Sequence, residues 1–243
     1  MTQVLTVTTQ KGGTGKTTTA AALAQAAVHR GKKVLAIDLD PQGNLSQALD
    51  GRPGIVDSYK LLNGIPLAAL VQATPQGIDF IPASRDLVTI QTGTGNARLL
   101  QRALTHLKKK YDVIVVDTPS AGILQYNALQ AATGVIMPVE IDTYNIQSLY
   151  EMTDTVTQIR ASNPDLSFTG IVISKYDGRS KMARELKQTI IDKAAELGAL
   201  YLGCIPLTVT VKEAAAFRKS LFIYAPKSKV SQEFLRVYDS LTI

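Results

Sequence analysis

Short apolar runs rich in β-branched residues alternate with helical patterns from one end of the chain to the other. Runs that are apolar throughout predict strands buried on both faces, and their alternation with helices predicts crossovers between parallel neighbours. Strands are expected at residues 4–7, 33–37, 78–81, 112–116, 134–139, 168–174 and 200–205. Helices are expected at about 16–30, 97–110, 122–133, 144–161, 180–197 and 229–241. The sequence therefore predicts an α/β fold: a single domain over residues 1–243, with a mostly parallel twisted sheet and helices on both faces.

A glycine-rich loop with the sequence QKGGTGKT lies between the first expected strand and the first expected helix. Glycines let backbone N–H groups turn toward a phosphate, and the start of a helix favours negative charge. Strand, loop, Gly-Lys-Thr and helix in this order are typical of the phosphate loop of nucleoside triphosphatases. The first position of the usual pattern is Gln10 instead of glycine, and Lys11 is an additional lysine. The residues expected to bind the nucleotide are Gly12, Gly13, Thr14, Gly15, Lys16, Thr17 and Thr18.

The segment KGGTGKTT (11–18) resembles the deviant Walker A motif of the ParA/MinD family. Three further segments are similar to that family: DLDPQGN (38–44) to its switch I, VVDTPS (115–120) to its Walker B and switch II, and 205–228 to its C-terminal block. The resemblance covers nearly the whole chain. It implies a P-loop NTPase fold of the SIMIBI kind and a homodimer that encloses ATP.

Two catalytic roles follow for the lysines of the loop. Lys16 is expected to reach the β and γ phosphates, while the Thr17 hydroxyl binds Mg²⁺. The resemblance implies that Lys11 reaches the nucleotide of the partner protomer. A cation supplied in trans would make hydrolysis conditional on dimerisation, because phosphoryl transfer is catalysed mainly by positioning and by charge neutralisation.

Three aspartates are candidates for the metal and the attacking water. Asp117 ends an expected strand, so its carboxylate should lie at the carboxyl edge of the sheet and hold Mg²⁺ through water. The resemblance assigns Asp40 to orienting the attacking water and Asp38 to the surroundings of Mg²⁺. For Asp38, capping of the turn remains an alternative.

The nucleotide base is expected beside the late strands. GTP-binding relatives carry an NKxD-type loop there, whereas this chain has SKYD at 174–177, which favours ATP. Ser174 and Lys175 on one side and Pro206 on the other are therefore the candidates for the adenine pocket.

The net positive charge lies in one segment: residues 160–229 hold 12 Lys and Arg against 6 Asp and Glu, and the remainder holds 14 against 14. A localised excess favours a polyanion-binding face over an ordinary solvated surface. Without a helix-turn-helix, zinc-finger or aromatic stacking pattern, the contact should be with DNA phosphates and independent of sequence. Dimerisation with ATP would then control DNA binding by avidity alone. The candidate contacts are Arg184, Lys187, Arg218, Lys219, Lys227 and Lys229.

Three functions remain open at this stage. The first is a partition ATPase that binds DNA as an ATP dimer and positions a plasmid, a chromosome origin or a protein body. A ParB-like or adaptor protein would stimulate its slow, Mg²⁺-dependent hydrolysis. The second is a MinD-like membrane switch; it is disfavoured, because the stripe Val230, Phe234, Val237 and Leu241 has few basic neighbours and is typical of a helix that packs on a core. The third is a metabolic ATPase or synthetase of the same superfamily.

The composition restricts where the protein is expected to reside and which metal sites it can form. No apolar run is long enough for a membrane span, and no leader precedes the first strand, so the expected location is the cytoplasm, at the nucleoid. No separate N-terminal helix-turn-helix domain is expected. With Cys204, His29 and His106 as the whole complement of Cys and His, a Cys/His metal site or a cysteine-bridged cluster is not expected.

Overall fold

The computed structural model describes residues 2–52, 56–66, 69–90, 96–105, 110–142 and 144–241. In these residues one eight-stranded sheet has the order β3-β4-β2-β5-β1-β6-β7-β8, and neighbouring strands are parallel except for the β3–β4 pair. The strands are β1 Gln3–Val7, β2 Val34–Asp38, β3 Gln72–Ala73, β4 Asp79–Ile81, β5 Val113–Asp117, β6 Gly134–Val139, β7 Ser167–Tyr176 and β8 Leu200–Pro206. The prediction of a mostly parallel α/β fold is confirmed.

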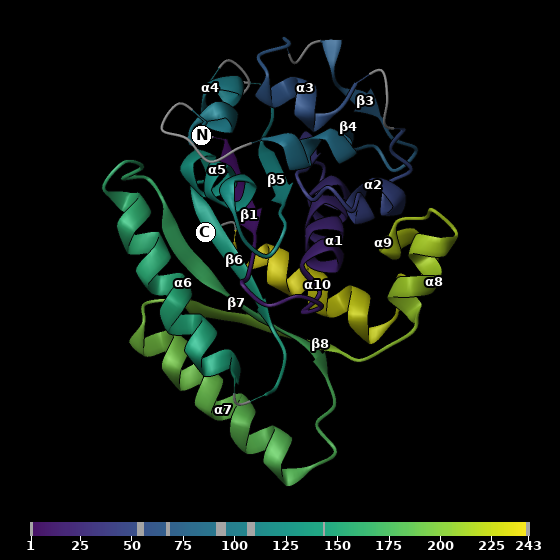
Figure 1. The fold of residues 1–243 in the computed structure, drawn as a ribbon. Coiled ribbons are helices and arrows are strands. Elements are labelled where there is room, and N and C mark those ends of the chain that lie inside the picture. Colours follow the sequence, from purple (N-terminus) through teal and green to yellow (C-terminus); the bar gives the residue numbers. More distant parts are fainter. Residues whose placement is uncertain are drawn as a thin grey trace.

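Helices cover both faces of this sheet (Figure 1). The first half of the chain contains α1 Lys16–His29, α2 Asn44–Ala48, α3 Ser58–Leu62, the 3₁₀ helix η2 Arg85–Thr89, α4 Leu99–Leu104 and α5 Ile123–Ala131. The second half contains α6 Tyr144–Arg160, α7 Lys181–Glu196, α8 Thr210–Ala216, α9 Leu221–Tyr224 and α10 Lys229–Asp239.

Alternation along the central strands divides the core into two layers. In β5, Val113 and Val115 pack with α1 and α10, whereas Ile114 and Val116 pack with α3, α4 and α5 on the other face. A further cluster between the sheet and helices α6 and α7 extends this second layer. Both faces of the sheet are therefore buried, which explains why the strands are apolar throughout.

The last helix contributes to the first layer. Val230, Phe234 and Val237 of α10 are at most 2% exposed, and Leu241 is 7% exposed. The expectation that this stripe packs on the core is confirmed, and no helix among the described residues is both long and apolar enough to cross a membrane.

Several short elements were not predicted, namely α2, α3, β3, η2, α8 and α9. β3 has only two residues and each of these helices seven or fewer, which is too short to display a strand or a helical period, respectively. The helix predicted at 97–110 is observed over Leu99–Leu104; residues 106–109, including His106, lie outside the described residues, as do residues 91–95.

Candidate nucleotide-binding site

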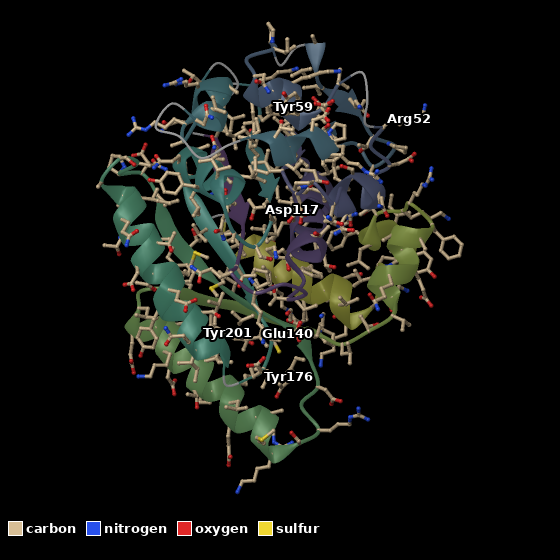
Figure 2. All side chains as sticks on the ribbon, in the orientation of Figure 1. Arg52, Tyr59, Asp117, Glu140, Tyr176 and Tyr201 are labelled. Carbon is tan, nitrogen blue, oxygen red and sulfur yellow. The ribbon has the colours of Figure 1, made fainter. Side chains whose placement is uncertain are left out.

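The central strands β1, β2 and β5 end at the same edge of the sheet. Val7 of β1 is in register with Asp117 of β5, and Asp117 is in register with Asp38 of β2. The glycine-rich loop leaves β1 at this edge and enters α1. Figure 2 shows Asp117 near the centre of the molecule. The site thus lies outside the carboxyl ends of parallel strands, where open α/β sheets bind their ligands.

Two glycines determine the shape of the loop. Gly13 and Gly15 have φ angles of 78° and 88°, and Gly15 directly precedes the first turn of α1. A side chain would strain the backbone in this left-handed region. Two of the three loop glycines that the sequence assigned to phosphate binding, Gly13 and Gly15, are therefore required by the loop conformation itself.

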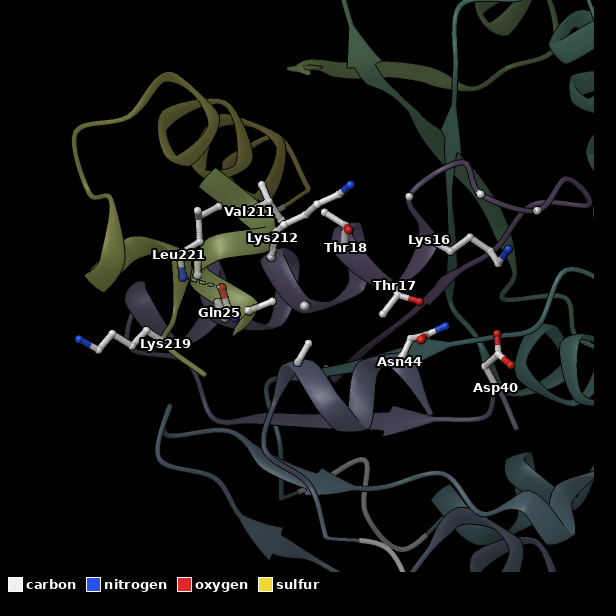
Figure 3. Close-up of a pocket in the computed structure, with 18 of the residues that line it drawn as sticks. Lys16, Thr17, Thr18, Gln25, Asp40, Asn44, Val211, Lys212, Lys219 and Leu221 are labelled. Carbon is white, nitrogen blue, oxygen red and sulfur yellow. Dashed lines mark hydrogen bonds between the residues drawn. The ribbon is translucent and has the colours of Figure 1, made fainter. Parts of the chain in front are cut away.

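A cavity of about 510 Å³ opens beside the loop. Figure 3 shows it running along α1, with Lys16 and Asp40 at one end and Lys219 at the other. Its polar lining comes from Lys16, Thr17, Thr18, Gln25, Asp40, Asn44, Ser120, Lys212 and Lys219, and Gly12, Gly13 and Gly15 contribute backbone.

Lys16 points its ammonium group into the strand-end region. Its side chain is 8% exposed, and Nζ donates to Ser120 Oγ at 2.8 Å and to the Lys11 carbonyl at 3.5 Å. Burial lowers the pKa of Lys16, and the carboxylates of Asp117 and Asp40 oppose that shift. The cation is therefore held near two negative charges and is partly desolvated, which strengthens its attraction for a phosphate.

Lys11 takes a different direction from the same loop. Its ammonium forms an ion pair with Asp142, beyond the end of β6. Lys11 does not line the cavity, whereas Lys16 does. The side chains of the two lysines therefore point in different directions from one loop.

Asp117 is completely buried, and its pKa is raised well above the ordinary value, first by desolvation and then by the neighbouring charge of Asp38. One carboxylate oxygen, Oδ2, has no hydrogen-bond partner although it is buried. An unpartnered buried oxygen is costly unless something binds it. With the nearby Thr17 hydroxyl, which stabilises the carboxylate, this donor set fits a hard cation that keeps several waters and binds phosphate oxygens.

Asp38 is also completely buried, but its oxygens are satisfied within the protein. Oδ2 accepts hydrogen bonds from the Ser46 backbone N–H and hydroxyl, both at 2.8 Å, and Oδ1 accepts one from the Asp40 N–H at 3.0 Å. Burial raises the pKa of Asp38 to about 6, although the Ser46 hydrogen bonds oppose the shift. These contacts support the turn-organising role left open for Asp38 and fix the segment that carries Asp40.

Asp40 is half-buried and lines the cavity. Its Oδ1 accepts a hydrogen bond from the Gln42 N–H at 3.0 Å, and its carbonyl accepts one from Gly43. The carboxylate is thus held in a tight turn at the edge of the phosphate site, where an oxygen acceptor can orient water.

The residues predicted to contact the base lie behind the loop and do not line the cavity. Ser174 Oγ donates to the Thr14 carbonyl at 2.7 Å, and Lys175 Nζ donates to the Gly13 carbonyl at 2.5 Å and pairs with Glu140 at 2.8 Å. Pro206 ends β8 opposite Tyr176. In this structure, then, Ser174 and Lys175 brace the loop from the side of β7.

The basic candidates fall into separate groups. Arg184 and Lys187 are on α7, whereas Arg218 and Lys219 follow α8 on another side of the molecule (Figure 1). Arg184 donates to the Gly178 and Arg179 carbonyls, and Lys187 lies 5.2 Å and 5.5 Å from the rings of Tyr176 and Tyr201. Lys227 and Lys229 flank Ser228 at the start of α10. The structure therefore does not unite the six cations into one patch.

Four residues that shape the site were not predicted from the sequence. Ser120 accepts from Lys16, Asp142 pairs with Lys11, and Gln25 and Lys212 line the cavity. Gln25 had a recognisable signal, since it is the polar residue within the run AAALAQAA. The partners of the lysines depend on contacts more than 100 positions apart, which local patterns do not encode.

The fold and the site define a P-loop nucleoside triphosphatase built on a parallel sheet, and the comparisons with known proteins agree. A family model described as an AAA domain matches residues 2–168. The chromosome-partitioning ATPase Soj of Thermus thermophilus is 36% identical over 238 residues, covering 96% of this chain and 92% of that protein. The chromosome-partitioning protein ParA of Caulobacter vibrioides is 36% identical over 248 residues, covering 97% and 92%.

A solved structure extends the comparison. Cobyrinic acid a,c-diamide synthase from Mycobacterium smegmatis, with bound ADP and magnesium, matches with a TM-score of 0.81 at 30% identity, covering 99% of this chain and 94% of that one. The chain belongs to the ParA/MinD family of ATPases.

Proposed function

We propose that this chain is an ATP-dependent dimerising ATPase that binds DNA without sequence preference as an ATP dimer and positions or segregates a cargo. The observation that carries the proposal is the divergence of the two loop lysines. Lys16 lines the cavity of its own protomer, whereas Lys11 points away from it and pairs with Asp142. A second loop lysine that does not serve its own phosphate site is suited to serve the site of a partner copy.

The nucleotide is ATP, bound with Mg²⁺. When bound, Mg²⁺ would supply positive charge that neutralises the phosphates. Within the chain, Thr17 and the unpartnered oxygen of Asp117 would hold it, directly or through water. Lys16 and the backbone of Gly12 to Gly15 bind the phosphates, and Asp40 orients the water. Because Asp38 fixes the Asp40 turn, it acts on catalysis through Asp40.

The adenine site is proposed beside the braced side of the loop, with Ser174, Lys175 and Pro206, whereas Thr18 lines the cavity on α1. Lys175 has a positive φ of 51°, which is uncommon for a residue with a side chain and is often found at functional positions. Its ion pair with Glu140 and its bond to the loop would make base binding sensitive to loop geometry.

The cargo would be a plasmid, a chromosome origin or a protein body at the nucleoid, and a ParB-like or adaptor protein would stimulate slow hydrolysis. Support comes from relatives whose names specify chromosome partitioning. DNA contact is proposed for Arg218, Lys219, Lys227 and Lys229, with Arg184 and Lys187 as a second group.

A second candidate is an ATP-dependent synthetase, because the chain matches a cobyrinic acid a,c-diamide synthase at 30% identity. Amide synthesis needs an acceptor site next to the γ phosphate. A product assay with that protein's substrate and an amide donor tests this alternative.

The decisive experiment compares DNA and lipid binding at matched salt, each with ATP, with ADP and without nucleotide. We expect a shift of unrelated DNA duplexes with ATP only, and no co-sedimentation with anionic vesicles. Vesicle binding that requires ATP, without a DNA shift, would favour a membrane switch instead.

A further inference from the structure

Ser120 lies beside the phosphate site, three positions after the end of β5. It is half-buried and lines the cavity together with Lys16, Thr17 and Asp40. Figure 3 shows the Lys16 ammonium and the Asp40 carboxylate at the same end of that cavity. Because Ser120 Oγ is 2.8 Å from Lys16 Nζ, the Ser120 hydroxyl is at this end too, where the phosphates of a nucleotide are expected.

The Ser120 hydroxyl has the capacity for a further hydrogen bond. Its oxygen accepts from Lys16 Nζ, and an ammonium group can only donate. Among the residues that the structure describes, none accepts a hydrogen bond from the Ser120 hydroxyl. A serine hydroxyl donates one hydrogen bond and also accepts. Ser120 can therefore donate to a ligand oxygen while it still accepts from Lys16.

The backbone that carries Ser120 is anchored to the segment that leads into the phosphate loop. Thr118 Oγ1 donates to Thr8 Oγ1 at 2.9 Å, and Gln125 Nε2 donates to the same oxygen at 2.7 Å. These three side chains are at most 8% exposed, and buried polar groups are costly to separate from their partners. Pro119 restricts the backbone between Thr118 and Ser120. The hydroxyl is thus held in place relative to the loop before a nucleotide binds.

The arrangement around the Lys16 ammonium relates Ser120 to the terminal phosphate. Two acceptors that each lie 2.8 Å from one tetrahedral ammonium are about 4.6 Å apart. The other oxygens of a phosphate held by Lys16 extend into this gap, within reach of the Ser120 hydroxyl. The carboxylates of Asp117 and Asp40 act on the Lys16 charge from the same end of the site. Since Asp40 is proposed to orient the attacking water, the phosphate at this end is the γ phosphate.

We propose that Ser120 donates a hydrogen bond to the γ phosphate and is a further substrate-contacting residue that distinguishes ATP from ADP. This inference rests on the proposed function, in which ATP occupies the phosphate site. A hydrogen bond to a charged oxygen is stronger than one between neutral groups. The anchored hydroxyl needs no rearrangement to form it, which is the property of an effective donor in a nucleotide site.

A simpler account would give Ser120 the single role of occupying Lys16 while the site holds no nucleotide. In that case a phosphate must displace the hydroxyl, so removing the hydroxyl would strengthen the binding of ATP and ADP alike. The proposed contact has the opposite sign, because its loss weakens the binding of ATP alone. The two accounts are therefore separated by the direction of one change in affinity.

The test is the substitution Ser120→Ala. The affinities of a non-hydrolysable ATP analogue and of ADP are measured with Mg²⁺ by competition against a fluorescent nucleotide. We expect the affinity for the ATP analogue to fall by about tenfold or more, the effect of losing a hydrogen bond to a charged group. The affinity for ADP should stay within about twofold of the wild type, because ADP has no γ phosphate.

Two further variants make the result specific. Ser120→Thr keeps a hydroxyl at the same position and should retain the wild-type preference for ATP. Ser240→Ala removes another half-buried serine hydroxyl with one hydrogen bond of 2.8 Å, to the Val237 carbonyl at the end of α10, and should change neither affinity. Thermal unfolding of each variant shows that the comparison is made between folded proteins.

Equal weakening of the ATP analogue and ADP in Ser120→Ala would overturn the proposal, since it would show a general disturbance of the loop. Unchanged or tighter binding of the ATP analogue would overturn it in favour of the simpler account. A loss of preference in Ser120→Thr as large as that in Ser120→Ala would also overturn it. If the wild type binds neither nucleotide, the proposed function itself fails, and the contact fails with it.

Discussion

The phosphate site and the basic segment place their charges in opposite surroundings. Lys16, Asp38 and Asp117 are buried at the ends of the central strands, and each has a defined set of neighbours. Arg218 and Arg184, in contrast, are exposed, and their partners are the half-buried carboxylate of Asp50 and loop carbonyls. Charges interact strongly where water is excluded and weakly where it is not. A single substitution at the phosphate site should therefore have a large effect on ATP binding or hydrolysis. DNA affinity, in contrast, should change in proportion to the number of charges removed from the basic segment.

The largest effect is expected for the two loop lysines, which should fail in different ways. Lys11→Ala should lower turnover by about 10³-fold or more, the effect of losing a cation supplied in trans, while ATP affinity stays close to that of the wild type. Lys16→Ala should abolish ATP binding, because a desolvated phosphate contact is lost. Titration with a fluorescent ATP analogue and light scattering separate the two outcomes. An equal loss of ATP affinity in both variants would argue against the role of Lys11 in trans.

The next largest effect is expected for substitution of Asp40, the aspartate of switch I. Asp40→Ala should reduce hydrolysis by about 10²- to 10⁴-fold, the contribution of a positioned general base or water acceptor. The ATP dimer should still assemble and remain on DNA, since the phosphate contacts are intact. Single-turnover hydrolysis and size-exclusion chromatography with ATP measure both properties. Hydrolysis at the wild-type rate would show that the assignment of switch I is wrong.

At the basic segment the expected effect is smaller and independent of sequence. Replacing both Arg218 and Lys219 with alanine should reduce the salt slope by about 1.8 per protomer, the value for two phosphate contacts, and so by about 3.6 in the ATP dimer. Unrelated duplexes should be affected equally, and ATP-dependent dimerisation should persist. Lys32→Ala with Lys33→Ala is a matched control, because these two lysines are also exposed and adjacent. If the control variant lowers the salt slope by the same amount, the effect comes from net charge in general and not from a defined DNA-binding face.

The smallest effect concerns pH. The pKa of Asp38 is about 6 in the folded protein against an ordinary value of 3.8, so between these values the folded state binds more protons than the unfolded state. The free energy of unfolding should therefore rise by about 1 kcal/mol as pH falls from 7 to 5, relative to Asp38→Asn. Urea unfolding at the two pH values gives the comparison. If the wild type instead loses stability relative to Asp38→Asn as the pH falls, the raised pKa of the buried Asp38 carboxyl is wrong.

The same contrast explains what the sequence could predict. The strands and the glycine loop have strong local signals, and the structure places them as expected. The direction of Lys11, the hydrogen bonds of Asp38 and the Gln25–Gln76 contact depend on segments far apart in the chain. Local periodicity carries no information on such pairs. The division of the six basic candidates between α7 and the C-terminal block likewise required the fold.

The central claim is that ATP joins two DNA-binding faces, and the salt dependence of DNA affinity tests it most directly. If each protomer neutralises about three phosphates, the log–log slope should be near −2.7 without ATP and near −5.4 with ATP. Between 50 and 200 mM salt these slopes correspond to losses of roughly 40-fold and 1,700-fold. The account predicts this doubling on any duplex sequence. A slope that ATP leaves unchanged, or tight binding without ATP, would contradict it.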